Sequence, residues 1–106
     1  MASVGRGEVW IVDLGFAGKR RPCVVLSVPP ADSERALVVI IPGTTSVWGT
    51  RFEVRLDLPF LNKAGGVFDA QNLQAVSQAK LVQRLGSLSP EQMRSIEAAA
   101  RLWLGL

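Results

Sequence analysis

Hydrophobic and polar residues alternate along most of this chain with a period typical of β-strands. The stretch RFEVRLDL (51–58) alternates cleanly, with its apolar residues on one side and its charged residues on the other, which predicts a half-exposed strand. Residues 8–14 (EVWIVDL) predict a second strand. The runs CVVLSV (23–28) and ALVVII (36–41) are almost entirely apolar, so we expect strands that are covered on both faces.

The pattern changes to helical spacing near the end of the sequence. Ser89 stands at a helix N-cap position, Pro90 follows at the first helical position, and Gln92 completes a capping-box pattern. Glu97 and Arg101 have the spacing of an i,i+4 ion pair. The apolar positions that repeat with helical spacing are Met93, Ile96, Ala100 and Trp103.

The order of these elements predicts the fold class. Residues 67–76 and 79–85 predict two shorter strands, so a series of strands precedes one terminal helix. We therefore expect a mainly β domain of the α+β class, with a small, curled antiparallel sheet that the helix closes. A chain of 106 residues is long enough for one core, so residues 1–106 are expected to form a single domain.

Apolar residues make up 48% of the chain, which is a large share for a small domain with so much surface. The surplus predicts a face that a second copy covers, as in a homodimer. The longest apolar run, residues 36–42, is far shorter than the ~20 residues of a membrane-spanning helix. The first ten residues lack the apolar centre of a signal peptide, so we expect no membrane association and a cytoplasmic location.

The formal net charge of +3 favours a polyanionic partner, although the excess is mild. The chain has no histidine, so the commonest general base and metal ligand are missing. Its single cysteine, Cys23, falls in an apolar strand and is expected to be structural. The acidic residues are scattered along different predicted strands, which predicts no metal site: Glu8, Asp13, Glu53 and Asp57. We expect no cofactor.

Two predicted loops carry the candidate chemistry. In GFAGKRRP (15–22), Pro22 restricts Arg21 to an extended conformation at the mouth of a strand. In IPGTTSVWGT (41–50), consecutive hydroxyl residues between glycines could cradle phosphate oxygens, and Trp48 offers a face for an unstacked base. Each feature also has a structural interpretation: a solvated basic loop, ordinary turn hydrogen bonds, or a tryptophan that anchors its loop.

The order of four short motifs resembles the MazF/PemK toxins of bacterial toxin–antitoxin pairs. These motifs are RGEVWIVDL, RPCVVLS, VVIIPGTTS and WGTRFEVRLD, and the resemblance extends from about Arg6 to Leu81 with a matching terminal helix. It implies a small SH3-like antiparallel barrel of the MazF/CcdB/PemK type. It also implies the toxin of a type II toxin–antitoxin system, a homodimer that binds single-stranded RNA and a cognate acidic antitoxin.

The resemblance also implies the site residues. The catalytic arginine of the family falls on Arg21 and its catalytic threonine on Thr44. The loop before Arg21 lacks the glutamate and glutamine that many relatives carry, and Gln71-Asn72 replaces a frequent Asp-Gln pair. The further residues expected to bind RNA are Phe16, as a substitute contact, with Lys19, Arg20, Thr45, Ser46, Trp48, Arg51 and Gln71.

The expected reaction is sequence-selective cleavage of messenger RNA without a metal, which would inhibit translation and growth. The 2′-hydroxyl of the RNA would act as nucleophile and leave a 2′,3′-cyclic phosphate, while Arg21 and Thr44 stabilise the transition state. Two alternatives stay open at this point. One is a non-catalytic toxin of the gyrase-inhibitor type on the same fold, and the other is a barrel that only binds RNA.

Overall fold

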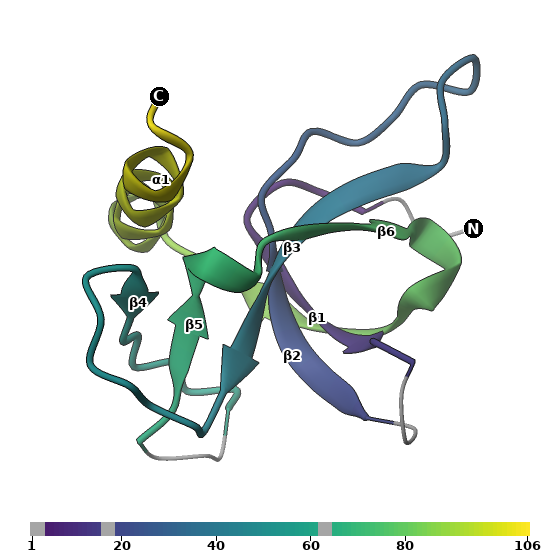
Figure 1. Ribbon diagram of the computed structural model, residues 1–106. Coiled ribbons are helices and arrows are strands. Elements are labelled where there is room, and N and C mark those ends of the chain that lie inside the picture. The colour runs from purple at the N-terminus through teal and green to yellow at the C-terminus, as the bar shows by residue number, and fades with distance from the viewer. Residues whose placement is uncertain (1–3, 16–18, 62–64) are drawn as a thin grey trace.

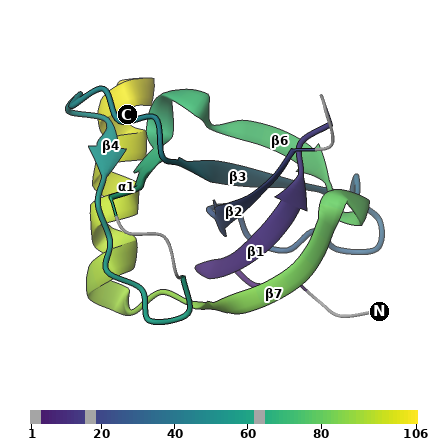
Figure 2. The same ribbon diagram turned by 90° about the horizontal axis from the view of Figure 1, so that it is seen from below.

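The computed structural model of the protein describes residues 4–15, 19–61 and 65–106. A curled antiparallel sheet forms most of it, and one helix packs against one side of that sheet (Figures 1 and 2). The elements in chain order are β1 (Glu8–Asp13), β2 (Arg20–Val25), β3 (Leu37–Thr44), β4 (Glu53–Val54), β5 (Val67–Asp69), the 3-10 turn η2 (Ala70–Asn72), β6 (Gln74–Ser77), the 3-10 turn η3 (Gln78–Lys80), β7 (Leu81–Ser87) and α1 (Pro90–Leu104).

Strand β3 organises the sheet because it has three partners. The strand order is β4-β5-β3-β2-β1-β7, and β6 pairs with the first half of β3. The second half of β3 pairs with β5 through Gly43 and Thr44. The described strands therefore curl without closing, with β4 and β7 at the two ends of the order. The mainly β architecture with a C-terminal helix confirms the predicted fold class.

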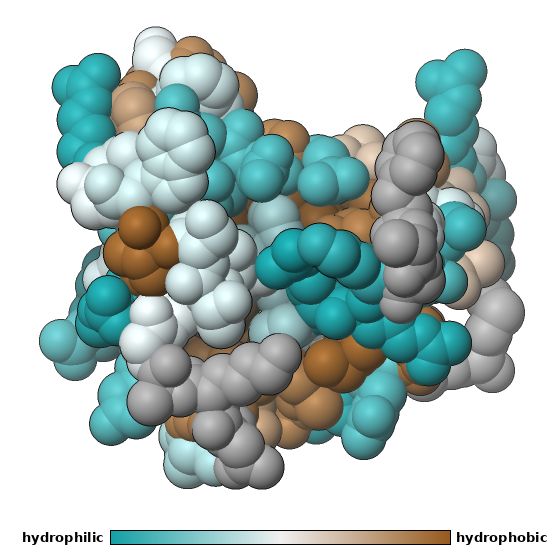
Figure 3. Space-filling view, turned by 60° about the horizontal axis from the view of Figure 1, so that its bottom comes forward, coloured by the Kyte–Doolittle hydropathy of each residue, from teal (hydrophilic) through white to brown (hydrophobic). Residues whose placement is uncertain are grey.

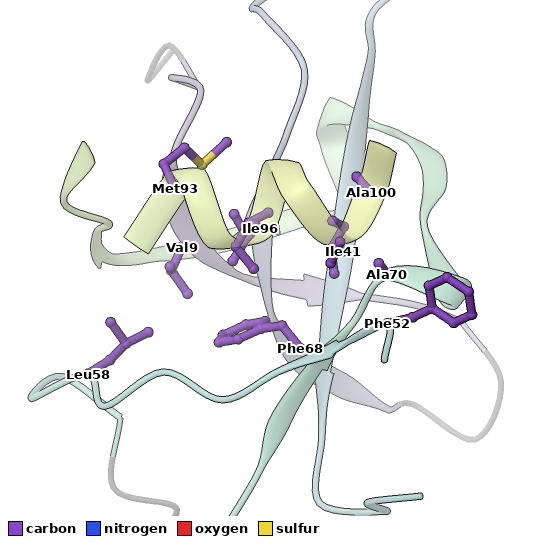
Figure 4. Close-up of a cluster of buried hydrophobic side chains, with 11 residues drawn as sticks. Val9, Ile41, Phe52, Leu58, Phe68, Ala70, Met93, Ile96 and Ala100 are labelled. Carbon is purple, nitrogen blue, oxygen red and sulfur yellow. The ribbon is translucent and has the colours of Figure 1, made fainter. Parts of the chain in front are cut away.

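The central strands bury side chains on both faces, as their continuous apolar runs predict. Val9, Val24 and Ile41 belong to the cluster under α1, where Figure 4 shows Val9 and Ile41 with Ile96 of the helix and Phe68 of β5. Their neighbours in sequence point to the opposite face and form a second cluster with Val4: Trp10, Val12, Cys23, Val25, Val38 and Ile40. This period of two is the reason why each strand carries an unbroken apolar run.

Helix α1 begins with the capping box that the sequence predicts. The Ser89 hydroxyl accepts a hydrogen bond from the Gln92 N–H at 3.1 Å, and the Gln92 side chain accepts one from the Ser89 N–H at 2.9 Å. Gly105 ends the helix in the left-handed conformation. The predicted Glu97–Arg101 pair is not what the structure shows, because Glu97 pairs instead with Arg6 from the N-terminal segment.

Three predicted strand boundaries are wrong, and in each case the partner strand is the reason. Strand β2 begins at Arg20, not at residue 23, because Arg20 and Arg21 pair with β1. Strand β3 continues past residue 41 to Thr44, because its end pairs with β5. The predicted strand 51–58 shrinks to β4, since its partner β5 has only three residues, although burial still alternates along the stretch.

No helix among the described residues is long and apolar enough to cross a membrane.

Candidate functional site

Arg21 and Thr44 come together at the ends of β2 and β3. The antiparallel register of β2 and β3 ends at the pair Cys23 and Pro42, and Arg21 and Thr44 each lie two residues beyond it, on adjacent strands. The strands stay close there, because a Cβ on Gly43 would lie only 3.0 Å from the Pro22 carbonyl oxygen. Both residues belong to strands, which corrects the expectation that they lie on loops.

Thr44 is held from its other side as well. It pairs with Val67 of β5, and a Cβ on Gly66 would lie 3.2 Å from the Thr44 carbonyl oxygen, so a side chain at position 66 would crowd this contact. The Thr44 hydroxyl oxygen accepts a hydrogen bond from the Ser46 N–H at 3.0 Å, the turn contact that hydroxyl residues often make. Its hydroxyl hydrogen remains able to donate to a ligand.

A cavity of about 630 Å³ opens beside this strand pair. Among the described residues, its charged lining consists of four cations, Lys19, Arg20, Arg21 and Arg55, and one carboxylate, Asp57. The strand ends at the bottom of Figure 1 come forward in Figure 3, where hydrophilic surface lies beside exposed hydrophobic surface. The remaining described residues that line the cavity are Pro22, Gly43, Thr44, Thr45, Leu56, Leu58, Leu61, Gly65, Gly66, Val67 and Phe68. We call this the cationic cavity.

A second cavity of about 290 Å³ shares Thr44 with the first. Trp48 is one of its lining residues and is 84% exposed, so it is not a buried anchor of its loop. The other residues of this lining are uncharged or acidic: Ser46, Thr50, Glu53, Asp69, Gln71 and Asn72. We call this the amide cavity. Thr44 therefore stands between a cationic compartment and one that offers hydroxyl, amide and carboxylate groups.

The cavities bring together most of the predicted RNA-binding residues. Lys19, Arg20 and Thr45 line the cationic cavity, and Ser46, Trp48 and Gln71 line the amide cavity. Arg51 lies away from both linings, with its guanidinium 4.8 Å from the centre of the Phe52 ring. Phe16 is outside the described residues.

Four charged residues in the described linings were not predicted: Glu53, Arg55, Asp57 and Asp69. The first three stand on the polar side of the alternating stretch 51–58, so the signal that could have found them is present. The prediction of a long exposed strand hid it. In the structure the chain leaves β4 after Val54 and turns Arg55 and Asp57 to the cationic cavity.

The environment of Cys23 agrees with the prediction that this residue is structural. The side chain is completely buried, and burial raises the pKa of its thiol to about 12, against smaller opposing effects of the Gly43 backbone and Arg21. A thiol that stays protonated at neutral pH is a poor nucleophile. Within residues 4–15, 19–61 and 65–106, no group of three or more histidine, cysteine or acidic side chains is placed to hold a metal ion.

Known proteins share both the sequence pattern and the fold. Residues 5–104 match the family described as the PemK-like, MazF-like toxin of type II toxin–antitoxin systems. A probable endoribonuclease, MazF5 of Mycobacterium tuberculosis, is 37% identical over 94 residues, which span 86% of this chain and 84% of that protein.

Two solved structures agree with this match. A mycobacterial endoribonuclease in complex with its cognate antitoxin superposes with a TM-score of 0.81 at 28% identity, covering 98% of this chain and 97% of the other. The Mycobacterium tuberculosis toxin MazF-mt6 gives a TM-score of 0.79 at 26% identity, covering 93% and 97%. The resemblance inferred from the four motifs is therefore confirmed. This chain belongs to the PemK/MazF family of type II toxin–antitoxin toxins.

Proposed function

We propose that this toxin is a sequence-selective endoribonuclease that cleaves single-stranded RNA in the cytoplasm and thereby inhibits translation and growth. The family and the related probable endoribonuclease support the activity. The observation that carries the proposal is that Arg21 and Thr44, from the adjacent strands β2 and β3, line one cationic cavity. A guanidinium and a hydroxyl that line the same cavity suit a phosphodiester, because both can donate hydrogen bonds to phosphate oxygens.

The proposed reaction uses a nucleophile that the RNA itself supplies. The 2′-oxygen attacks the adjacent phosphorus, the bond from phosphorus to the 5′-oxygen breaks, and the products are a 2′,3′-cyclic phosphate and a 5′-hydroxyl. One proton leaves the 2′-hydroxyl and one reaches the departing 5′-oxygen, so the step consumes no water and needs no metal to activate one. Arg21 and Thr44 stabilise the extra negative charge that the phosphoryl oxygens gain in the transition state.

We assign the two cavities different parts of the RNA. The cationic cavity binds the scissile phosphate and its neighbours, and Lys19, Arg20 and Thr45 increase affinity there. The amide cavity receives a base, with Trp48 as a stacking surface and Ser46 and Gln71 as hydrogen-bonding groups. Arg51, which is in neither lining, and Phe16, which is outside the described residues, stay proposals as RNA contacts.

We also propose that the toxin is a homodimer and that a cognate antitoxin with an acidic, flexible segment blocks the site. Exposed apolar side chains at the end of α1 suit a covered surface: Leu102, Trp103, Leu104 and Leu106. The cations around Arg21 suit carboxylates of such a segment. Light scattering at micromolar concentration tests the dimer, and a monomer there would contradict it.

A gel assay with unstructured RNA tests the activity. Discrete fragments are the expected result. A shifted but intact band would indicate a protein that only binds RNA, and neither change would indicate a toxin with a protein target. The fragments should be mapped on two unrelated RNAs, since cuts at one shared sequence are expected of a selective nuclease and random cuts would contradict selectivity.

A further inference from the structure

The Glu53 carboxylate accepts hydrogen bonds from the backbone of the loop that carries Trp48. Its Oε2 accepts a hydrogen bond from the Trp48 N–H at 3.0 Å. Its Oε1 accepts two more, from the Gly49 N–H at 2.7 Å and the Thr50 N–H at 3.2 Å. The Glu53 N–H in turn donates to the Thr50 carbonyl at 3.3 Å. One side chain thus fixes three consecutive amides, residues 48–50.

These contacts favour the ionised carboxylate. The Trp48 N–H, followed by those of Gly49 and Thr50, lowers the pKa of Glu53 despite some desolvation. Gly49 adopts φ of 76°, a backbone conformation that brings successive N–H groups toward one acceptor. The ion pairs seen among the described residues use other carboxylates, Glu8 and Glu97. The described hydrogen bonds of the Glu53 side chain all go to this loop.

Glu53 itself stands on a fixed part of the molecule. It pairs with Asp69 of β5, and the preceding residue, Phe52, is buried in the cluster under α1. The Phe52 carbonyl also accepts a hydrogen bond from the Ala70 N–H at 3.0 Å. The Trp48 ring, by contrast, is exposed and has little packing to hold it. The position of Trp48 over the amide cavity therefore depends on its backbone, and that backbone depends on Glu53.

We propose that Glu53 is a positioning residue for RNA recognition: it holds residues 48–50 so that the Trp48 ring is presented to a base at the amide cavity. This inference rests on the proposed function, because it needs RNA as the ligand. Without the carboxylate the exposed Trp48 ring samples many orientations. Ordering the ring when RNA binds then costs part of the free energy that stacking contributes. Glu53 acts on substrate affinity and leaves the phosphate chemistry at Arg21 and Thr44 unchanged.

The variant Glu53→Gln tests the proposal, because the amide keeps the shape and loses the charge and one acceptor. We expect KM for a cleavable RNA to rise by about tenfold with kcat within about twofold, the pattern of lost uniform binding. Amide hydrogen exchange of Trp48, Gly49 and Thr50, followed by NMR, should accelerate by at least about tenfold. The double variant Glu53→Gln/Trp48→Ala should be no worse than Trp48→Ala alone, since both remove the same contact.

Glu34→Gln is the matched control. Glu34 is also exposed and accepts a hydrogen bond from a loop amide, Ala31 N–H at 2.7 Å, but it lines neither cavity. It should leave KM unchanged. If Glu53→Gln does not fold, Gly49→Ala replaces it, because this glycine has open space around it and only its positive φ resists a side chain. It should strain the same loop and raise KM without changing kcat.

Three results would overturn the proposal: an unchanged KM, a fall in kcat at constant KM, or losses from Glu53→Gln and Trp48→Ala that multiply. Failure of the wild-type protein to cleave RNA would contradict the proposed function instead. In that case the exchange rates and the binding of an uncleavable 2′-deoxy oligonucleotide would still decide the role of Glu53. Equal binding by the wild type and the variant would count against it.

Discussion

The two cavities that meet at Thr44 differ in charge and in what each can recognise. In the described part of the chain, the cationic cavity has four cations against one carboxylate, whereas the charged residues of the amide cavity are the carboxylates Glu53 and Asp69. Phosphates are the same at every position of an RNA, so cations bind them without reading sequence. Bases differ in their donors and acceptors, which amides and hydroxyls can distinguish, while a stacked ring adds affinity for the base.

We therefore propose that chemistry and selectivity belong to separate walls of one site. A change in the cationic cavity should lower the rate on every RNA alike. A change in the amide cavity should lower affinity and alter which sequences are cut. Thr44 belongs to both linings, so its loss should disturb the chemistry. Variants of the other lining residues should still show the effect expected for their own cavity.

The largest effect is expected from the substrate and not from the protein. An RNA with a 2′-deoxy sugar just 5′ of the scissile phosphate should bind and remain uncut, because the proposed nucleophile is missing. Cleavage of the normal RNA should continue in EDTA. Mass spectrometry of the fragments should show a 2′,3′-cyclic phosphate or its opened 3′-phosphate. A 5′-phosphate product, or activity that EDTA removes and magnesium restores, would contradict the mechanism.

The next largest effect is expected at the strand ends. Arg21→Ala and Thr44→Ala should each lower kcat by about 100- to 1000-fold on every RNA tested, the scale of losing one transition-state donor. Circular dichroism should be unchanged. Arg94→Ala, which removes an exposed arginine of α1 outside both linings, is the control for lost positive charge. Near-normal cleavage by Arg21→Ala would refute the site assignment.

The strand-end geometry also shows where sequence reasoning reaches its limit. Apolar runs and the capping box indicate that the central strands and the helix exist, since each is a local property of neighbouring residues. Pairing is not local. Arg21 and Thr44 belong to strands because β1 and β5 pair with them, and no local pattern at residues 20–22 or 42–44 carries that information.

The stretch 51–58 illustrates the same limit for the site. Its alternation predicts burial well, since Phe52 and Leu58 are buried while Arg55 and Asp57 are exposed. Alternation cannot show that the partner strand β5 has only three residues. Most of the predicted strand 51–58 therefore has no partner strand among the described residues and forms part of the cavity walls instead. The motif resemblance made Arg21 and Thr44 candidates, whereas Glu53, Arg55 and Asp57 became candidates only once the strands were placed in space.

A smaller and more selective effect is expected at Trp48. Trp48→Ala should weaken RNA binding by roughly 5- to 100-fold, the scale of one lost base-stacking contact, while kcat at saturating RNA stays close to normal. The loss should differ between RNA sequences, which side-by-side measurement of kcat/KM on a set of oligonucleotides would show. An equal loss in kcat on all of them would mean that Trp48 supports the chemistry, and the division between the two cavities would fail.

The smallest effect should come from Lys19, at the edge of the cationic cavity. Its exposed ammonium contributes attraction to the RNA backbone without a fixed place beside the reacting phosphate. Lys19→Ala should therefore leave kcat unchanged and reduce the slope of log K against log salt by about 0.7, the value for one phosphate contact on a single strand. The measurement is a salt titration of binding to the uncleavable 2′-deoxy oligonucleotide, with Lys80→Ala on η3, which lines neither cavity, as control. A fall in kcat with an unchanged slope would place Lys19 beside Arg21 in the chemistry and extend the catalytic part of the site to the start of β2.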